Sequence, residues 1–147
     1  MPRLSLTPLA SYGYTTEITV RTTDLNYGGH LGNDRLLALL HEARVGFLAA
    51  HGWSELDCGG VPLIMGDAAL VFRGEAFAGD VLRIAVGVSE TGRAGFRLSY
   101  LVTRPADGAD VAVAETGLAG FDYAKRGIAP LPDDLRSALE DLRHEAR

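Results

Sequence analysis

Apolar and polar residues alternate from position 14 to position 20, and this period of two predicts a strand with one buried face. The next segment, residues 24–33, contains three glycines and two asparagines, which is typical of a loop. A helix follows: Asn33 is expected to cap its start, and Gly52 is expected to end it at about His51. Because apolar residues spread around most of this helix, we expect it to be buried on nearly all sides.

The period of two returns after residue 61 and predicts several more strands. We expect them at residues 62–72, with an interruption at Gly66, and at residues 82–88, 96–102 and 111–123, separated by turns or loops at 79–80, 91–93 and 104–108. The last strand is expected to place Val111, Val113, Ala119, Phe121 and Tyr123 on one face. A short amphipathic helix with Leu135, Leu139 and Leu142 along one side is expected to begin near Asp133.

One buried helix and about five strands joined mostly by tight turns predict an α+β fold, in which an antiparallel sheet wraps around the long helix. Helices do not alternate with strands, which argues against a doubly wound parallel sheet. The length of 147 residues fits a single domain over residues 1–147. Such a sheet leaves an edge open, and two copies paired through their sheet edges would cover it.

Composition and charge narrow the function classes. Hydrophobic residues make up 47% of the chain, and the net charge of −5 argues against a nucleic-acid-binding surface. No long apolar run occurs, so we expect neither a signal peptide nor a membrane-spanning helix. The one cysteine, Cys58, cannot form an internal disulfide, and a cytoplasmic location fits best. The chain has no metal-ligand pattern and no phosphate-loop or dinucleotide motif, so we expect neither a metal nor a cofactor.

The loop before the long helix is the first candidate for chemistry. Five polar residues fall within eleven positions: Asp24, Asn26, His30, Asn33 and Asp34. They precede a helix start, whose free N–H groups can polarise a carbonyl oxygen or hold an anion. The glycines of the loop let its backbone approach a ligand closely. The alternative is structural: Asp24 and Asn26 brace the turn, and Asn33 only caps the helix.

Glu42 is the second candidate, because an acid in the middle of a buried helix is unusual. The small residues Ala38 and Gly46 flank it at four-residue spacing and leave room for a ligand. A carboxylate in such a niche is suited to general-base or nucleophilic work. Alternatively, Glu42 pairs with an arginine or faces solvent. Its neighbour His41 points about 100° away around the helix and is interpreted as structural, and Arg44, which falls within the apolar arc, is expected to reach solvent or to pair with an acid.

Residues 20–34 (VRTTDLNYGGHLGND) and 40–44 (LHEAR) resemble the 4-hydroxybenzoyl-CoA thioesterase-like hot-dog superfamily, as do the turn at 79–80 and the segments 121–123 and 130–135. The resemblance implies a five- or six-stranded antiparallel sheet wrapped around one long helix. It implies that two subunits pair their sheets and that two dimers often associate. It also implies a thioester bound in the dimer interface, where a backbone N–H near the helix start polarises its carbonyl and a carboxylate activates water or attacks directly.

The chain departs from one branch of this superfamily, in which an acid stands two residues after the position of Asp24. Asn26 stands there instead, and an amide cannot act as a base, although it can hold water or the thioester oxygen. Glu42, which matches the helix glutamate of other branches, therefore becomes the expected catalytic acid, with Asp24 in reserve. His30 matches a histidine that would orient water or substrate. The expected substrate-binding residues are Tyr27, Gly29, Leu31, Asn33, Gly66 and Asp67, and the candidates for holding the CoA phosphates are Arg73, Arg93, Arg97, Arg104, Lys125 and Arg126.

Three functions follow from these observations. The first is hydrolysis of an acyl-CoA or acyl-carrier-protein thioester by a homodimer or a homotetramer. The second is a dehydratase or hydratase of 3-hydroxyacyl thioesters that uses His30 with Glu42. The third is a non-catalytic acyl-CoA-binding protein, which the amide at Asn26 favours. Thiol release, loss of enoyl absorbance without thiol release, and stabilisation by ligand without turnover separate the three.

Overall fold

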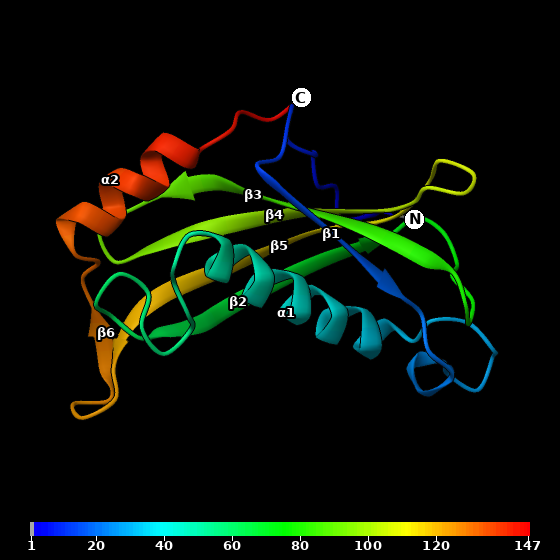
Figure 1. Ribbon diagram of the computed structural model, residues 1–147, viewed down its shortest axis with the longest axis horizontal. Helices are drawn as coiled ribbons and strands as arrows, with labels where there is room; N and C mark the ends of the chain where they lie inside the picture. The colour runs from blue at the N-terminus through cyan, green and yellow to red at the C-terminus, as the bar shows by residue number, and fades with distance from the viewer. Residues whose placement is uncertain (1) are drawn as a thin grey trace.

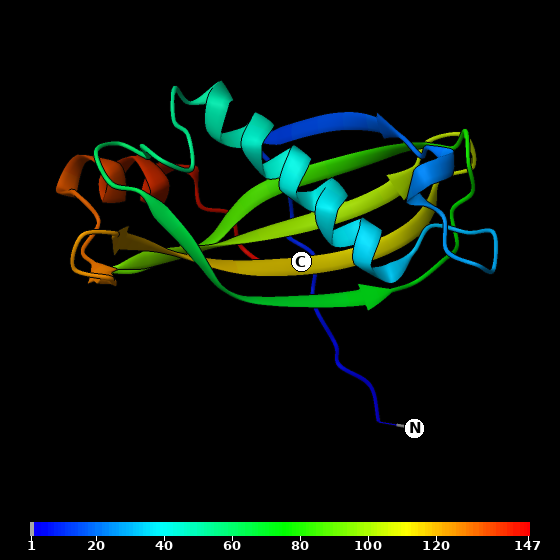
Figure 2. The same cartoon turned by 90° about the horizontal axis from the view of Figure 1, so that it is seen from below.

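A computed structural model describes residues 2–147. One antiparallel sheet curves around a long helix, and a second, shorter helix lies at one end of the sheet (Figures 1 and 2). The strands are β1 (Tyr14–Thr19), β2 (Leu63–Phe72), β3 (Val81–Thr91), β4 (Gly95–Arg104), β5 (Ala109–Asp122) and β6 (Gly127–Ala129); the helices are α1 (Asn33–Ala50), α2 (Asp133–Leu142) and the 3-10 turn η1 (Thr22–Asp24). The expected α+β hot-dog architecture is confirmed.

The strands follow the order β1-β3-β4-β5-β2, and β6 pairs with β5 at one end. β3, β4 and β5 therefore form two successive hairpins, whereas β1 and β2 lie at the two edges. The pairing of β2 with β5 shifts register between Met65 and Asp67, so the interruption expected at Gly66 is a β-bulge. The three-residue strand β6 was not predicted.

The core lies between α1 and the inner face of the sheet. α1 contributes Leu36, Leu40 and Phe47 to it, and the strands contribute alternate side chains such as Leu98 and Tyr100. The opposite face of α1 is exposed at Ala38, His41, Glu42 and Val45. The expectation that α1 is buried on nearly all sides is therefore wrong for the single chain, because the sheet covers only one side of the helix.

The outer face of the sheet is covered in part by the two ends of the described chain. Leu6 and Tyr12 pack on a small cluster formed by Ala85, Leu101 and Val113. The backbone N–H of Ala10 donates to the carbonyl of Glu145 at 2.8 Å, so the two segments lie side by side. In β5 the inward residues are Ala112, Ala114 and Leu118, whereas Val113 faces outward with this cluster. Val111 packs in the main core, so the predicted alignment of Val111 and Val113 on one face is wrong. The reason is a shift in the pairing of β4 with β5, which skips Val111.

Candidate active site

Asp24 fixes the turn that leads into the loop. Its buried carboxylate accepts hydrogen bonds from the backbone N–H of Arg21 at 2.8 Å and from the Arg21 guanidinium at 3.2 Å through both Nε and Nη2. These hydrogen bonds hold the pKa of Asp24 below its usual value of 3.8. The carboxylate therefore stays ionised and engaged with Arg21, which is the geometry of a brace.

Asn26 and His30 contact each other across the loop. The Asn26 side-chain oxygen accepts from the backbone N–H of Gly28 at 2.9 Å, and the Asn26 backbone N–H donates to the carbonyl of His30, also at 2.9 Å. The Asn26 amide nitrogen lies 3.5 Å from Nδ1 of His30, and Nε2 of His30 lies 4.0 Å from the carboxylate of Glu75. The side-chain oxygen of Asn26 thus serves an Asx turn.

The start of α1 carries no side-chain cap. Gly32 occupies the cap position and Asn33 is the first helical residue, so the expectation that Asn33 caps the helix is wrong. The side chain of Asp34 folds back so closely that a Cβ placed on Gly32 would lie 2.8 Å from its carboxylate oxygen. A glycine cap brings no oxygen to the first N–H groups of the helix, which leaves them suited to a carbonyl oxygen or an anion.

Two hollows lie along the exposed face of α1 and share one residue, Ala38. The first, between α1 and β2, has a volume of about 300 Å³ and is lined by Asp34, Leu37, Ala38, His41, Arg44 and Met65. The second, between α1 and β1, has a volume of about 430 Å³ and is lined by Glu17, Ile18, Thr19, Arg21, Ala38, Leu39 and Glu42. The small side chain of Ala38 separates the two.

Glu42 is exposed at the second hollow and adds to the negative charge around Arg21. The expectation that this carboxylate is buried is wrong for the single chain. Gly46, which was expected to leave room for a ligand, is covered by the ring and hydroxyl of Tyr14. Of the two small residues that flank Glu42, only Ala38 lies open.

A chain of polar contacts lies on the other side of Ala38. Nε2 of His41 lies 2.6 Å from the carboxylate of Glu55, whose second oxygen is 3.5 Å from Nε of Arg44. The Arg44 side chain is only 6% exposed, and its Nη1 donates to the hydroxyl of Tyr100 at 3.3 Å. The Tyr100 hydroxyl is 2.8 Å from that of Thr116, and burial raises the pKa of Tyr100. Arg44 thus pairs with an acid, as one of the two interpretations of the sequence expected.

Gly66 and Asp67 lie apart from these groups in the single chain. Asp67 forms an ion pair with Arg97 at 3.0 Å, and both residues line a hollow of about 310 Å³ with the β3–β4 turn. Tyr27 is fully exposed, and Gly29 adopts a φ of 81° with open space around it. Leu31, by contrast, is part of the core. The structure therefore brings together only part of the expected substrate-binding set.

Residues 20–139 match the model of the thioesterase-like superfamily, which decides the family. The chain belongs to this superfamily. A comparison with proteins of curated function found no match.

Solved structures agree in fold with this superfamily member. A 1,4-dihydroxy-2-naphthoyl-CoA thioesterase from Synechocystis superposes with a TM-score of 0.78 at 24% identity, over 88% of this chain and 96% of that one. A thioesterase complexed with coenzyme A and zinc from Thermus thermophilus gives a TM-score of 0.77 at 23% identity, over 91% and 97% of the two chains. A hypothetical protein from the same organism gives 0.77 at 26% identity, over 88% and 97%.

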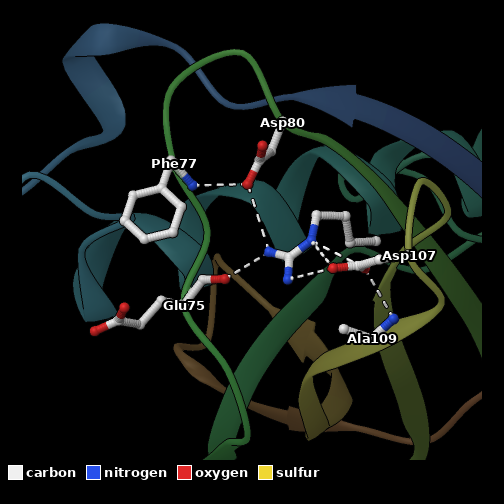
Figure 3. Close-up of polar contacts among 6 residues, drawn as sticks. Glu75, Phe77, Asp80, Asp107 and Ala109 are labelled. Carbon is white, nitrogen blue, oxygen red and sulfur yellow. Dashed lines mark hydrogen bonds and ion pairs between the residues drawn. The ribbon is translucent and has the colours of Figure 1, made fainter.

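The arginines of this superfamily member divide into paired and unpaired groups. Arg73 pairs with Asp110, and Arg97 pairs with Asp67 and Glu115. Arg104 donates to the carbonyl of Glu75 at 2.7 Å and pairs with Asp80 and Asp107, contacts that Figure 3 draws. Within residues 2–147, no ion pair involves the three remaining candidates, which are Arg93, Lys125 and Arg126.

Cys58 does not supply a nucleophile to this site. The thiol of Cys58 is buried, and burial raises its pKa to about 12, so it is a poor nucleophile. No cluster of three metal-binding side chains and no helix able to cross a membrane occurs in the part of the chain that the structure describes.

The pairing of His41 with Glu55 was not predicted from the sequence. No sequence signal links the two residues, because 14 positions separate them.

Proposed function

We propose that the protein hydrolyses an acyl-CoA thioester to the free acid and CoA. The observation that carries this proposal is the exposed face of α1, where two hollows meet at Ala38 beside Glu42, downstream of a helix start with no side-chain cap. Membership of the thioesterase-like superfamily supports it. So do the solved structures that are named as a CoA-thioester hydrolase and as a thioesterase with bound CoA.

In this mechanism Glu42 takes a proton from a water molecule, which attacks the thioester carbonyl carbon. The N–H groups at a helix start bind the carbonyl oxygen and stabilise its developing negative charge. Asn26 and His30 orient the water or the substrate, and Asp24 holds the loop. A helix rises roughly 1.5 Å per residue, so Glu42 lies about 14 Å along the axis from Asn33. One chain therefore cannot offer both groups to the same carbonyl.

A second copy of the chain supplies the missing half in this proposal. The edge strand β2 and the face of α1 expose Met65, Phe72 and Val45, which are large apolar side chains at an unpaired edge and an uncovered helix. Two copies that pair their β2 edges would bring the helix start of one chain toward the exposed face of α1 in the other, which carries His41, Ala38 and Glu42. Gly66 and Asp67, at the bulge of β2, would then reach the neighbouring loop. A dimer of such dimers is the larger assembly that we propose.

The CoA phosphates are proposed to bind Arg93, Lys125 and Arg126. Arg93 lies in the β3–β4 turn, and its carbonyl accepts from the N–H of Leu131, so this turn lies beside the segment that follows β6. Lys125 and Arg126 lie in the β5–β6 turn, at the end of the sheet opposite the 24–33 loop (Figure 1). Arg93→Glu with Lys125→Glu is expected to raise KM for acyl-CoA and to leave KM for the matching acyl-pantetheine unchanged. Equal effects on both substrates would contradict this placement.

The main test is release of thiol from acyl-CoA esters of several chain types, followed with a thiol-reactive dye. Glu42→Gln keeps the size of the side chain and removes the base, so we expect kcat to fall by about 10²- to 10⁴-fold. Glu140→Gln, at an exposed position on α2, is the matched control and is expected to keep full activity. An unchanged rate in Glu42→Gln would remove Glu42 from the mechanism.

A non-catalytic acyl-CoA-binding protein is the second candidate, because Asn26 stands where many members of the superfamily carry an acid. Thermal stabilisation by acyl-CoA without thiol release would establish it. The dehydratase alternative needs His30 near Glu42. In the single chain His30 contacts Asn26 and Glu75, whereas Glu42 lies at the hollow beside β1. Loss of enoyl-CoA absorbance without thiol release is the result that would favour it.

A further inference from the structure

We propose that His41, held by Glu55, is a second proton-transfer residue of this site and protonates the departing thiolate of CoA. This inference rests on the proposed function, since it assigns a further role within the same hydrolysis. Three observations carry it: the position of His41 relative to Ala38 and Glu42, its contact with Glu55, and the anchoring of Glu55 to the core.

The first observation is positional. His41 and Glu42 follow Ala38 by three and four residues, so both side chains lean back over the helical turn that carries Ala38. The two hollows agree with this, because Ala38 is shared between the hollow that His41 lines and the hollow that Glu42 lines. A thioester that lies across Ala38 therefore has Glu42 on one side and His41 on the other.

The second observation is the contact between His41 and Glu55. Nε2 of the imidazole lies 2.6 Å from the carboxylate, which is the distance of a short hydrogen bond. This contact uses one ring nitrogen and leaves Nδ1 for a group in the hollow. The negative charge of Glu55 balances the charge of a protonated imidazole, and a carboxylate that orients a histidine in this way is a recurring arrangement in hydrolases.

The third observation is that Glu55 is held from the core. Its carboxylate faces the buried guanidinium of Arg44, which donates to Tyr100, and Tyr100 is bonded to Thr116 on the neighbouring strand. The Glu55 backbone carbonyl also accepts from the N–H of Leu63 at the start of β2. The pair is thus fixed by two strands of the sheet, and groups fixed in this way suit proton transfer.

Atoms and electrons balance in the proposed step. Glu42 takes one proton from water, the hydroxide oxygen bonds to the carbonyl carbon, and the C–S bond breaks with its electron pair on sulfur. The protonated His41 gives its Nδ1 proton to that sulfur and becomes neutral. The proton on Glu42 passes to solvent, from which His41 regains one. The net reaction is thioester plus water to carboxylic acid plus thiol.

The test varies the leaving group. An aryl thiolate of low pKa leaves without a proton, whereas the alkyl thiolate of CoA gains from one. His41→Gln is therefore expected to lower kcat/KM about 100-fold for an acyl-CoA and to change it little for the same acyl group on nitrothiophenol. Glu55→Gln should act in the same direction with a smaller loss. Glu42→Gln should lower the rate for both esters, and His144→Gln, at the outer face, should lower neither.

A second measurement covers the case in which the aryl ester is a poor substrate. Added imidazole should restore part of the acyl-CoA rate in His41→Ala, because a free imidazole can occupy the hollow and donate a proton. Equal losses for both esters, or the lack of rescue where the aryl ester is not turned over, would show that His41 only ties α1 to the segment before β2 and would overturn the proposal. A wild-type protein that releases thiol from no ester at all would instead overturn the proposed function, and this inference with it.

Discussion

At the scale of single residues, the main contrast is between acids that are already engaged and acids that are open. Asp24 is enclosed by hydrogen bonds from Arg21, and its side chain is 4% exposed. Glu42, on the helix, is exposed and lines a hollow. A group that must exchange protons with water and substrate needs the second environment, whereas the first suits a structural anchor. In our proposal, Asp24 therefore positions the loop and Glu42 reacts.

The anchor role of Asp24 can be tested through pH. Asp24→Asn keeps the shape but weakens the hydrogen bonds from Arg21, so we expect the free energy of unfolding at pH 7 to fall by about 1–2 kcal/mol. Because the pKa of Asp24 is lowered in the folded state, its contribution is present above the usual value of 3.8 and is lost as the pH falls through the lowered pKa. The difference between wild type and variant in urea unfolding should therefore shrink below that pH. An equal difference at pH 7 and at the most acidic pH measured would contradict the anchor role.

At the scale of elements, α1 combines a core face with a face that stays open. The sequence predicted its bounds within one or two residues, because the glycines around it stop the helical pattern. It did not predict which face the sheet would leave open, since apolar residues such as Val45 lie on the exposed side as well. The faces of β5 were hard to predict for a related reason. Both faces are largely buried, so the alternation of apolar and polar residues carries little information there. Glu55 could not be placed beside His41, because 14 residues separate them and the connection has no regular pattern.

The packing of β1 on α1 gives a test at this scale. A Cβ on Gly46 would clash with the hydroxyl of Tyr14 in the wild type, so Gly46→Ala should destabilise the protein by about 1–3 kcal/mol. In a Tyr14→Ala background the clash is gone. The same substitution should then stabilise the protein by up to about 1 kcal/mol, because alanine has a higher helix propensity than glycine. Thermal or urea unfolding of the four proteins measures this change of sign. The same sign in both backgrounds would show that Tyr14 does not restrict Gly46.

At the scale of the whole molecule, the outer face of the sheet is partly covered, whereas its edge strand β2 is open. The outer face is covered in part by the two terminal segments, whereas β2 and the outer side of α1 have no cover within residues 2–147. The fold could be predicted from the sequence because it depends on local patterns. The complete site could not, because in our proposal half of it comes from another chain and no pattern within one chain records that contact.

The proposed dimer can be tested by changing charge at these positions. Val45→Glu and Met65→Glu place a carboxylate at the exposed faces of α1 and β2, and each is expected to shift light scattering from the mass of a dimer to that of a monomer. Thiol release should fall with the dimer. Ile128→Glu, at an exposed apolar residue of β6, is the control and should leave the mass unchanged. A monomeric wild type with full activity would contradict the shared site.

Arg104 is expected to slow the opening of the loop at the start of α1. The Arg104 side chain donates a hydrogen bond to the carbonyl of Glu75, in the segment after β2. The carbonyl of the next residue, Ala76, accepts a hydrogen bond from the N–H of Leu31 at 2.7 Å. Arg104 thus connects the loop to the end of β4, in addition to the backbone hydrogen bonds that Arg73 and Gly74 donate to Val111. Loss of the Arg104 contacts is therefore expected to speed exchange of the Leu31 amide with deuterated solvent. In the proposed function, a residue outside the two hollows of α1 would then affect how readily substrate enters.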